Sequence, residues 1–294
     1  MRWRPRAALT LREPAATVQP VDYRLVVADL DGTLRSRVLG VTPGTRAAIA
    51  AARARGARVC VATGRMWTSA APWVRLLAAD SPVILYNGGQ VLDFATGRIL
   101  YERRLSRDVA REALALLRRE PGAPVHLYLD DRVYVERPDP LTDAYAADDG
   151  VTVDVVPAFE PLLAADPYKM LVIGEPARMA ALGRAMREAA LPVHAVQSEP
   201  QYLEILPAGV SKGAALRAML DALGVPAEAV VAVGDNWNDL ELIEAAGLGV
   251  AMGHAPAGVR ARAAHVCGTS EEDGFREVIE RFVLGRPLGP GRLD

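Results

Sequence analysis

The stretch LVVADLDGT at residues 25–33 decides the fold. Its first four residues are apolar with no polar alternation, which predicts a strand buried on both faces of a parallel sheet. Asp29 and Asp31 follow two apart, so both lie on one side of the extended chain. Gly32 lets the backbone turn at the strand end, where open α/β sheets bind their ligands. The stretch therefore predicts a site at the carboxyl end of a buried strand.

Two acids at this spacing suit phosphoryl transfer. Asp29 can attack phosphorus and form an aspartyl phosphate. Asp31 can protonate the leaving group and then accept a proton from water. The simpler interpretation, that Asp-Gly merely turns the chain, is disfavoured by the full pattern of residues 29–33 after a buried strand.

Composition narrows the class of protein. The length of 294 residues suits one large or two ordinary domains. A net charge of −2 gives no sign of a polyanion-binding surface, so we expect no nucleic-acid partner. No apolar run reaches the roughly 18 residues that span a bilayer, so we expect no membrane partner and a cytoplasmic location. Two cysteines exclude a disulfide framework. The Arg-rich residues 1–20 are expected to be a disordered leader or, less favoured, an arm that touches nucleic acid or membrane.

Lysine and asparagine are scarce in this chain. Of 34 basic residues only Lys169 and Lys212 are lysine, and asparagine occurs only at positions 87, 236 and 238. A chain with this bias should keep these residues mainly where arginine, aspartate or glutamine cannot replace them. The five positions are therefore candidates for function.

The pattern of elements predicts an α/β fold with a parallel-sheet core and an α+β insertion. Strands alternate with helices over residues 21–88, and the alternation resumes over residues 207–283. In between, two hairpins and several helices predict an inserted domain at residues 89–206. Residues 284–294 are expected to form a loose tail.

Further polar residues stand at predicted strand ends and helix starts. Thr63 can donate a hydrogen bond to a phosphate oxygen, beside the backbone N–H groups of Gly64 and Arg65; the alternative is a plain helix N-cap. Lys212 opens a predicted helix, where the helix dipole disfavours a cation, so a bound anion would explain it. A solvated surface lysine is the alternative there.

Asp235 and Asp239 complete an oxygen-rich set with Asp29 and Asp31 that contains no histidine. Such a set favours Mg²⁺ over zinc. We expect Mg²⁺ to be held by Asp29, Asp31 through its backbone carbonyl, Asp235 and a phosphate oxygen, with Asp239 as a further ligand or a support behind it. Thr63 and Lys212 would then hold the remaining phosphate oxygens.

Four stretches in this order resemble the haloacid dehalogenase-like hydrolase superfamily: DLDGT at 29–33, TGR at 63–65, SKG at 211–213 and GDNWND at 234–239. The insertion resembles the C2 cap of Cof-type (class IIB) phosphatases, as do NG at 87–88, EILP at 204–207 and DG at 273–274. The resemblance implies a Rossmann-like core, Mg²⁺ dependence and hydrolysis of small phosphomonoesters. The substrate-binding residues expected on this basis are Gly32, Thr63, Gly64, Arg65, Asn87, Gly88, Lys212 and Asn238. Trp237 is bulkier than many residues at its position and is expected to narrow the cleft.

Residues of the insertion are expected to set substrate choice, since a closing cap excludes water and contacts the leaving group. The candidates, each with an equally simple packing or surface role, are His126, Tyr128, Asp130, Arg132, Lys169, Gln197 and Tyr202. Three functions stay open: a phosphatase of sugar phosphates or similar metabolites, a phosphotransferase or mutase that uses a second hydroxyl, and a metabolite-binding protein with a retired site. A homo-oligomer is also compatible with the sequence.

Overall fold

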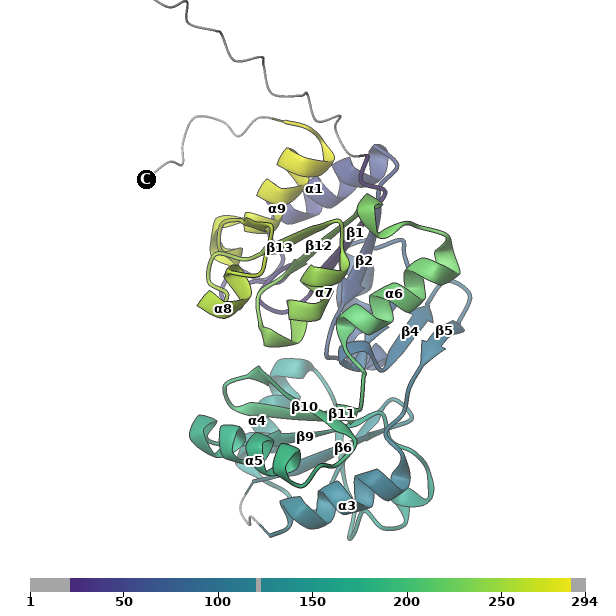
Figure 1. Ribbon diagram of the computed structural model, residues 1–294, viewed down its shortest axis with the longest axis vertical. Helices are drawn as coiled ribbons and strands as arrows, with labels where there is room; N and C mark the ends of the chain where they lie inside the picture. The colour runs from purple at the N-terminus through teal and green to yellow at the C-terminus, as the bar shows by residue number, and fades with distance from the viewer. Residues whose placement is uncertain (1–21, 120–122, 287–294) are drawn as a thin grey trace, which may run out of the picture.

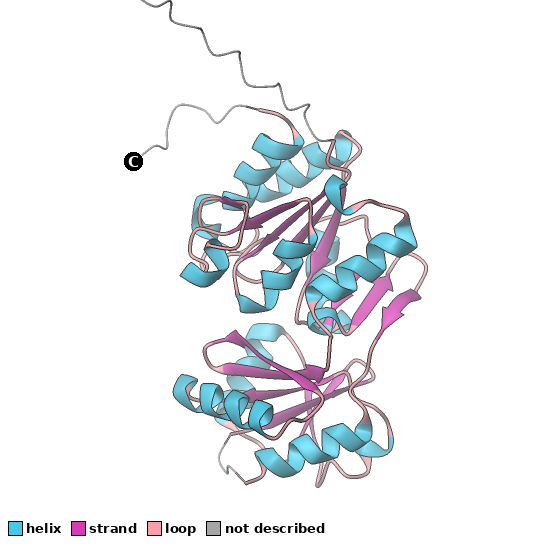
Figure 2. Cartoon of the chain, in the orientation of Figure 1, coloured by secondary structure: helices cyan, strands magenta, loops and turns pink. Residues whose placement is uncertain are grey.

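The computed structural model describes residues 22–119 and 123–286. The chain forms two lobes, each built on its own sheet (Figure 1). Helices and strands alternate in the upper lobe, whereas helices lie on both sides of the sheet in the lower lobe, one of them on the side that faces the upper lobe (Figure 2). The expected leader at residues 1–20 and most of the expected tail at 284–294 lie outside the described residues.

The first sheet has the strand order β14-β13-β12-β1-β2-β3-β4-β5. The strands β14 to β3 run parallel, and β1 lies between β12 and β2. This confirms the predicted parallel sheet and places the end of β1 near its middle. The strands are β1 (Leu25–Asp29), β2 (Arg58–Ala62), β3 (Val83–Leu85), β4 (Gln90–Asp93), β5 (Arg98–Glu102), β12 (Val230–Gly234), β13 (Leu248–Ala251) and β14 (His265–Val266).

Helices cover both faces of this sheet, which explains why β1 is apolar at every position before Asp29. Val26 and Ala28 pack in one cluster with residues of α1, α2 and α9, and Leu25 and Val27 pack in another with residues of α6 and α7. The helices are α1 (Pro43–Ala54), α2 (Trp67–Leu76), α6 (Lys212–Leu223), α7 (Leu240–Ala245), α8 (Ala257–Arg260) and α9 (Gly274–Val278). Short turns of other helix types are η1 (Tyr86–Gly88), η2 (Leu162–Ala164), η3 (Ala227–Ala229), η4 (Trp237–Asp239), η5 (Ser270–Glu272) and the π-helical η6 (Ile279–Val283).

The first predicted hairpin is present but belongs to the first sheet. Strand β4 pairs antiparallel with β3, and β5 pairs with β4. The expectation that an insertion begins at residue 89 is therefore wrong for the hairpin at residues 90–102. Its apolar residues complete the core: Val91 packs with Ile84 of β3 and residues of α6. We call residues 103–206 the inserted unit.

The inserted unit holds a six-stranded sheet of order β10-β11-β9-β6-β7-β8, antiparallel except for the pair β7–β8. Residues of α3 and α5 pack with those of one face of this sheet. Along β9 the alternation places Met170 and Val172 in that cluster and Lys169 and Leu171 on the other face, toward the core lobe. The elements are β6 (Val125–Leu129), β7 (Arg132–Val135), β8 (Val153–Val155), β9 (Lys169–Ile173), β10 (Val193–Glu199), β11 (Tyr202–Pro207), α3 (Arg107–Leu117), α4 (Pro140–Asp149) and α5 (Pro176–Glu188).

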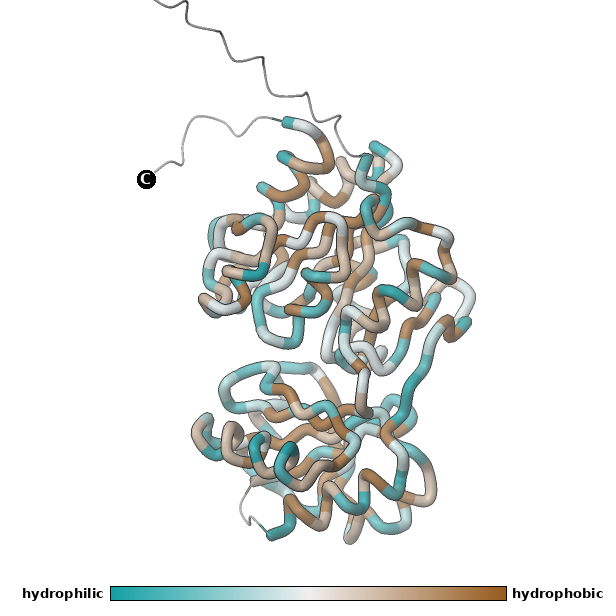
Figure 3. The backbone as a smooth tube through the Cα atoms, in the orientation of Figure 1, coloured by the Kyte–Doolittle hydropathy of each residue, from teal (hydrophilic) through white to brown (hydrophobic). Residues whose placement is uncertain are grey.

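Hydrophobic stretches run through the inside of both lobes, and hydrophilic stretches occupy many of the outer turns (Figure 3). Among the described residues, no helix combines the length and the apolar character that a membrane crossing requires.

Candidate active site

A cleft of about 140 Å³ lies where the two units meet. The carboxyl end of β1 supplies Asp29 and Asp31 to its wall, and the loops after β2 and β12 supply Thr63 and Asp235. The inserted unit contributes residues from α4, β9, β10 and β11. The cleft therefore lies at the strand ends where the sequence predicted a site, and both units form its wall.

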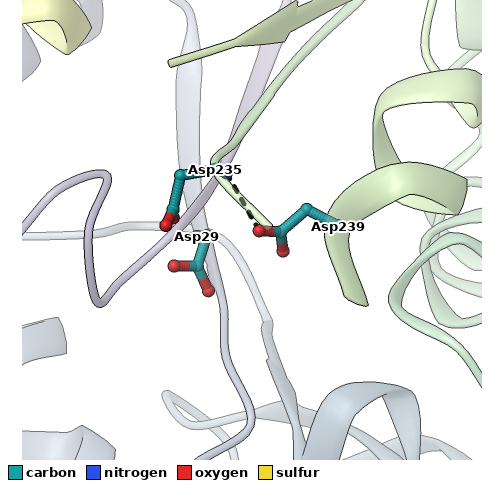
Figure 4. A group of neighbouring side chains, drawn as sticks. All are labelled: Asp29, Asp235 and Asp239. Carbon is teal, nitrogen blue, oxygen red and sulfur yellow. Dashed lines mark hydrogen bonds between the residues drawn. The ribbon is translucent and has the colours of Figure 1, made fainter. Parts of the chain in front are cut away.

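Three carboxylates meet in this cleft. Asp29, Asp235 and Asp239 each offer an oxygen, and these oxygens lie within 4.8 Å of one another. Figure 4 draws the three side chains close together; they come from β1, from the residue after β12 and from η4. All three residues are buried. Carboxylates packed this closely repel one another unless a cation lies among them, so the donor set fits a hard, oxygen-seeking cation such as Mg²⁺.

Lys212 supplies one cation to the group. Its Nζ lies 2.5 Å from Oδ1 of Asp29 and 2.6 Å from Oδ1 of Asp239, and the side chain has no exposed surface. The two carboxylates are anions that explain a lysine at the start of α6, and the alternative of a solvated surface lysine is wrong. The other oxygen of Asp239 accepts hydrogen bonds from the backbone N–H groups of Asp235 and Asn236, both at 3.0 Å. Both oxygens of Asp239 thus have protein partners, which favours a role in holding Lys212 and the loop.

Burial and charge shift the pKa values of these groups. Burial raises the pKa of Asp29 well above its ordinary value, and the other carboxylates add to this effect while Lys212 opposes it. Burial also raises the pKa of Asp239. For Lys212, burial lowers the pKa, but the carboxylates of Asp239 and Asp29 outweigh it and leave the pKa above its ordinary value. The ammonium group therefore stays charged between the two acids.

Gly32 and Thr33 set the position of Asp235. Gly32 has a φ of +93°, and a Cβ there would lie 2.4 Å from Oδ2 of Asp235, so only glycine fits. The hydroxyl of Thr33 donates to Oδ1 of Asp235 at 2.9 Å. The turn after β1 thus brings a carboxylate from a distant loop next to Asp29.

Asp31 points to two arginines and is not part of the group of three carboxylates. Its oxygens accept hydrogen bonds from Nε of Arg65 at 2.6 Å and from Nη1 of Arg35 at 2.7 Å. Burial raises the pKa of Asp31, but the hydrogen bonds and charges of Arg65 and Arg35 outweigh it, so the pKa lies below its ordinary value. Arg65 also forms an ion pair with Asp149 at the end of α4, at 3.2 Å. The side chain of Arg65 therefore connects Asp31 to the inserted unit.

The loop after β2 brings the Thr63 hydroxyl to the cleft. Thr63 is buried, and its Oγ1 accepts a hydrogen bond from the backbone N–H of Arg65 at 3.1 Å. That N–H was expected to bind phosphate and is already used. Thr63 and Gly64 both line the cleft.

The pair Asn87–Asn238 joins the ends of two loops. Nδ2 of Asn238 donates to Oδ1 of Asn87 at 3.0 Å, and Asn238 lines the cleft. Nδ2 of Asn87 and Oδ1 of Asn238 are buried without a hydrogen-bond partner. Gly88 has a φ of +102°, and a Cβ there would lie 2.1 Å from the carbonyl oxygen of Ser211. The absence of a side chain at Gly88 therefore lets the start of α6 approach this loop.

Among the candidates in the inserted unit, Lys169 and Tyr202 line the cleft. His126 is fully buried between the carbonyl of Leu171 and the hydroxyl of Thr142, and burial lowers its pKa to about 4, so its position is that of a core residue. The other four candidates do not line this cleft: Tyr128 lies in the core, Asp130 and Arg132 form ion pairs with Arg104 and Asp154, and Gln197 lines a second cavity.

The second cavity, of about 480 Å³, also contains Trp237, which does not line the first. The inserted unit also lines this second cavity, through Gln197, Glu199 and Pro200, so the expectation that Trp237 narrows the cleft between the units stays a prediction. The indole lies against Gly258, where an added Cβ would be 2.4 Å from the ring.

Sequence reasoning missed several residues that line the first cleft: Arg35, Arg37, Tyr145, Asp148, Asp149, Ser198, Glu199 and Gln201. The sequence did contain one signal for two of these residues. Asp148 and Asp149 end α4 just before Gly150, where the helix dipole disfavours negative charge, so they needed cationic partners. The structure supplies these as Arg35 and Arg65.

Comparison with known proteins agrees with this geometry. The family model of the haloacid dehalogenase-like hydrolases matches residues 26–279. Pyridoxal phosphate phosphatase YbhA of Escherichia coli is 30% identical over 274 residues, which cover 89% of this chain and 99% of the relative. The 5-amino-6-(5-phospho-D-ribitylamino)uracil phosphatase YitU of Bacillus subtilis is 29% identical, with 88% of this chain and 97% of the relative covered. The crystal structure of TM0651 from Thermotoga maritima superposes with a TM-score of 0.76 at 30% identity, covering 92% of this chain and all of that one.

Proposed function

Because the chain belongs to the haloacid dehalogenase-like hydrolases, we propose that it is a Mg²⁺-dependent phosphatase of small phosphorylated metabolites that forms a phosphoaspartate at Asp29. The observation that carries the proposal is the buried group of Asp29, Asp235 and Asp239 around Lys212, in a cleft between two units. Relatives named as phosphatases of pyridoxal phosphate and of a ribitylaminouracil phosphate support the substrate class. A cytoplasmic location goes with metabolites of this kind.

Asp29 is the nucleophile in this proposal. Its carboxylate stands at the end of the central strand, and one oxygen is bound to Lys212. The ammonium opposes the effect of burial on the pKa of Asp29 and offsets the repulsion between Asp29 and an incoming phosphate. Thr63, which lines the cleft, donates its hydroxyl to a phosphate oxygen. A bond forms between Asp29 and phosphorus as the bond from phosphorus to the alcohol oxygen breaks.

Asp31 moves the protons. Two residues beyond the nucleophile, it protonates the departing alkoxide and later takes a proton from the water that attacks phosphorus. Arg35 and Arg65 hold its carboxylate and lower its pKa. A substrate that displaces Arg65 or Arg35 from Asp31 would let the pKa of Asp31 rise. Asp31 would then be protonated when the bond from phosphorus to the leaving group breaks. The inserted unit acts as a cap that supplies this closed environment.

The carboxylates of Asp29 and Asp235 would hold Mg²⁺, with Asp239 behind them. A bound Mg²⁺ neutralises charge on the phosphate and orients it for in-line attack. The protein's own part is to fix the ligands in place, which Thr33 does for Asp235 and Lys212 does for Asp29.

Release of inorganic phosphate is the experiment that tests the proposal. We expect wild-type protein with Mg²⁺ to hydrolyse p-nitrophenyl phosphate and members of a panel of sugar, nucleotide and cofactor phosphates. Chelation with EDTA should abolish release, and added Mg²⁺ should restore it. Asp235→Asn should raise the Mg²⁺ concentration for half-maximal activity by at least about tenfold, because one anionic ligand is lost.

Two outcomes would contradict the proposal. Phosphate transferred to a second sugar hydroxyl with none released would indicate a phosphotransferase. Inactive wild-type protein that still binds a phosphate ester would indicate a binding protein. Asp143→Asn, the same change at an exposed position of α4 away from the cleft, serves as the control and should keep wild-type metal dependence.

A further inference from the structure

Lys169 stands in the inserted unit, yet its ammonium group contacts the core. Nζ donates a hydrogen bond to the backbone carbonyl oxygen of Gly64 at 2.9 Å. It lies 2.9 Å from Oε2 of Glu204 and 4.4 Å from the ring centroid of Tyr128. The residue is only 2% exposed. A carbonyl, a carboxylate and a ring face therefore surround the ammonium.

The carbonyl that Lys169 contacts belongs to the peptide group between Gly64 and Arg65. The N–H of the same peptide group donates to Oγ1 of Thr63 at 3.1 Å. Because Oγ1 accepts this hydrogen bond, its own O–H is directed elsewhere, and Thr63 lines the cleft. A continuous chain thus runs from the Lys169 ammonium through one peptide group to the Thr63 hydroxyl.

Hydrogen bonds in such a chain polarise one another. A cation at the Gly64 carbonyl makes the N–H at the other end of the peptide a stronger donor, and this in turn makes the Thr63 hydroxyl a stronger donor. We propose that Lys169 is a positioning residue of the inserted unit that orients and strengthens the Thr63 hydroxyl as a donor to the phosphoryl group. The inference rests on the proposed function, in which Thr63 binds that group.

The surroundings explain why this position holds one of only two lysines in the chain. A guanidinium is a planar fork, whereas a compact ammonium can meet a carbonyl, a carboxylate and a ring face together. Glu204 is itself 4% exposed and accepts a hydrogen bond from Ser198 at 3.0 Å on its other oxygen, Oε1. A buried cation needs such a fixed counter-charge. Lys169 and Glu204 thus form a built pair directed at the core loop.

A double-mutant cycle between Lys169→Met and Thr63→Val tests the inference. With p-nitrophenyl phosphate and with glucose 6-phosphate, we expect Lys169→Met to lower kcat/KM by about 10- to 100-fold and by the same factor for both esters, because the effect acts on the phosphoryl side. Inhibition by inorganic phosphate should weaken as well. In the Thr63→Val background, Lys169→Met should lower kcat/KM by less than about threefold, because the hydroxyl donor that Lys169 supports is gone.

Several results would overturn the inference. One is that Lys169→Met lowers kcat/KM by the same factor in the wild-type and Thr63→Val backgrounds. Another is that the loss of kcat/KM differs strongly between the two esters, which would indicate contact with the leaving group. If Lys169→Met does not fold, Lys169→Met/Glu204→Gln leaves no buried charge unpaired and takes its place in the cycle. Arg132→Met, which removes an exposed cation of the same sheet, is the control and should keep wild-type activity. Wild-type protein that hydrolyses no ester would refute the proposed function instead.

Discussion

The Asp29→Asn variant is expected to retain less than about one thousandth of the wild-type kcat on every phosphate ester, because an amide cannot attack phosphorus. The change keeps the shape of the side chain at the end of β1. It also keeps the fold, since Lys212 retains its ion pair with Asp239 at 2.6 Å. Burial already disfavours the charged form of Asp29. We therefore expect the free energy of unfolding to stay equal or to rise.

Phosphate release and thermal unfolding, measured on the same preparation, check this expectation. Inactivity with an unchanged or higher melting temperature would support a chemical role for Asp29. The control Asp143→Asn should show wild-type kcat. Substantial turnover by Asp29→Asn with the substrates that the wild type uses would assign the nucleophile to another residue or to water.

The Lys212→Met variant is expected to lose both activity and stability. Its ammonium group is the cation between Asp29 and Asp239, and all three side chains are buried. Removal of one partner from such a group leaves buried carboxylates without a counter-charge and costs about 3–5 kcal/mol in unfolding free energy. In the proposed function the ammonium also offsets the repulsion between Asp29 and phosphate, so kcat/KM should fall by at least about a hundredfold. Chemical denaturation and steady-state kinetics measure the two losses separately.

A second variant separates the two effects of Lys212. Lys212→Met/Asp239→Asn removes one of the stranded carboxylates, so stability should partly return while activity stays low. Lys212→Arg keeps the charge, but its planar fork does not fit a fully enclosed position between two carboxylates. Lys212→Met with wild-type stability, or with wild-type activity, would contradict the account of this residue.

Much of the core could be predicted from local sequence because each decisive signal lies within a few residues. The apolar run before Asp29 marks a strand covered on both faces, and the structure has it so. Scarce lysine and asparagine also marked residues near the site: Lys212 contacts Asp29, and Asn238, which lines the cleft, is hydrogen-bonded to Asn87. Each of these residues is marked either by its neighbours in the sequence or by belonging to a residue type that is scarce in this chain.

What sequence could not supply is the pairing between distant elements. The hairpin at residues 90–102 has the same local pattern whether it joins the core sheet or the insertion, and only its contact with β3 decides. The same holds for Arg65, whose guanidinium connects Asp31 with Asp149, and for Arg35, which contacts Asp31 and Asp148. Arginine is the common basic residue of this chain, so an arginine at a given position carries no signal of function.

The same limit explains why most of the candidate residues in the insertion do not line the cleft. His126 and Tyr128 are polar residues in strands, which sequence alone cannot assign to a cleft or a core; the structure buries both. Lys169 pairs with an acid of the insertion, but Glu204 lies 35 positions away, and local sequence could not identify it as the partner. Only the antiparallel pairing of β9 with β11 brings them together.

Chemical trapping of the phosphorylated residue tests the central claim most directly. The protein is quenched during turnover and treated with borohydride, which reduces an aspartyl phosphate to homoserine. Trypsin then releases residues 25–35, which contain both Asp29 and Asp31. The account predicts homoserine at position 29, only when substrate and Mg²⁺ are both present. Homoserine at position 31, or turnover with none at position 29 under conditions that trap a known aspartyl phosphate, would contradict it.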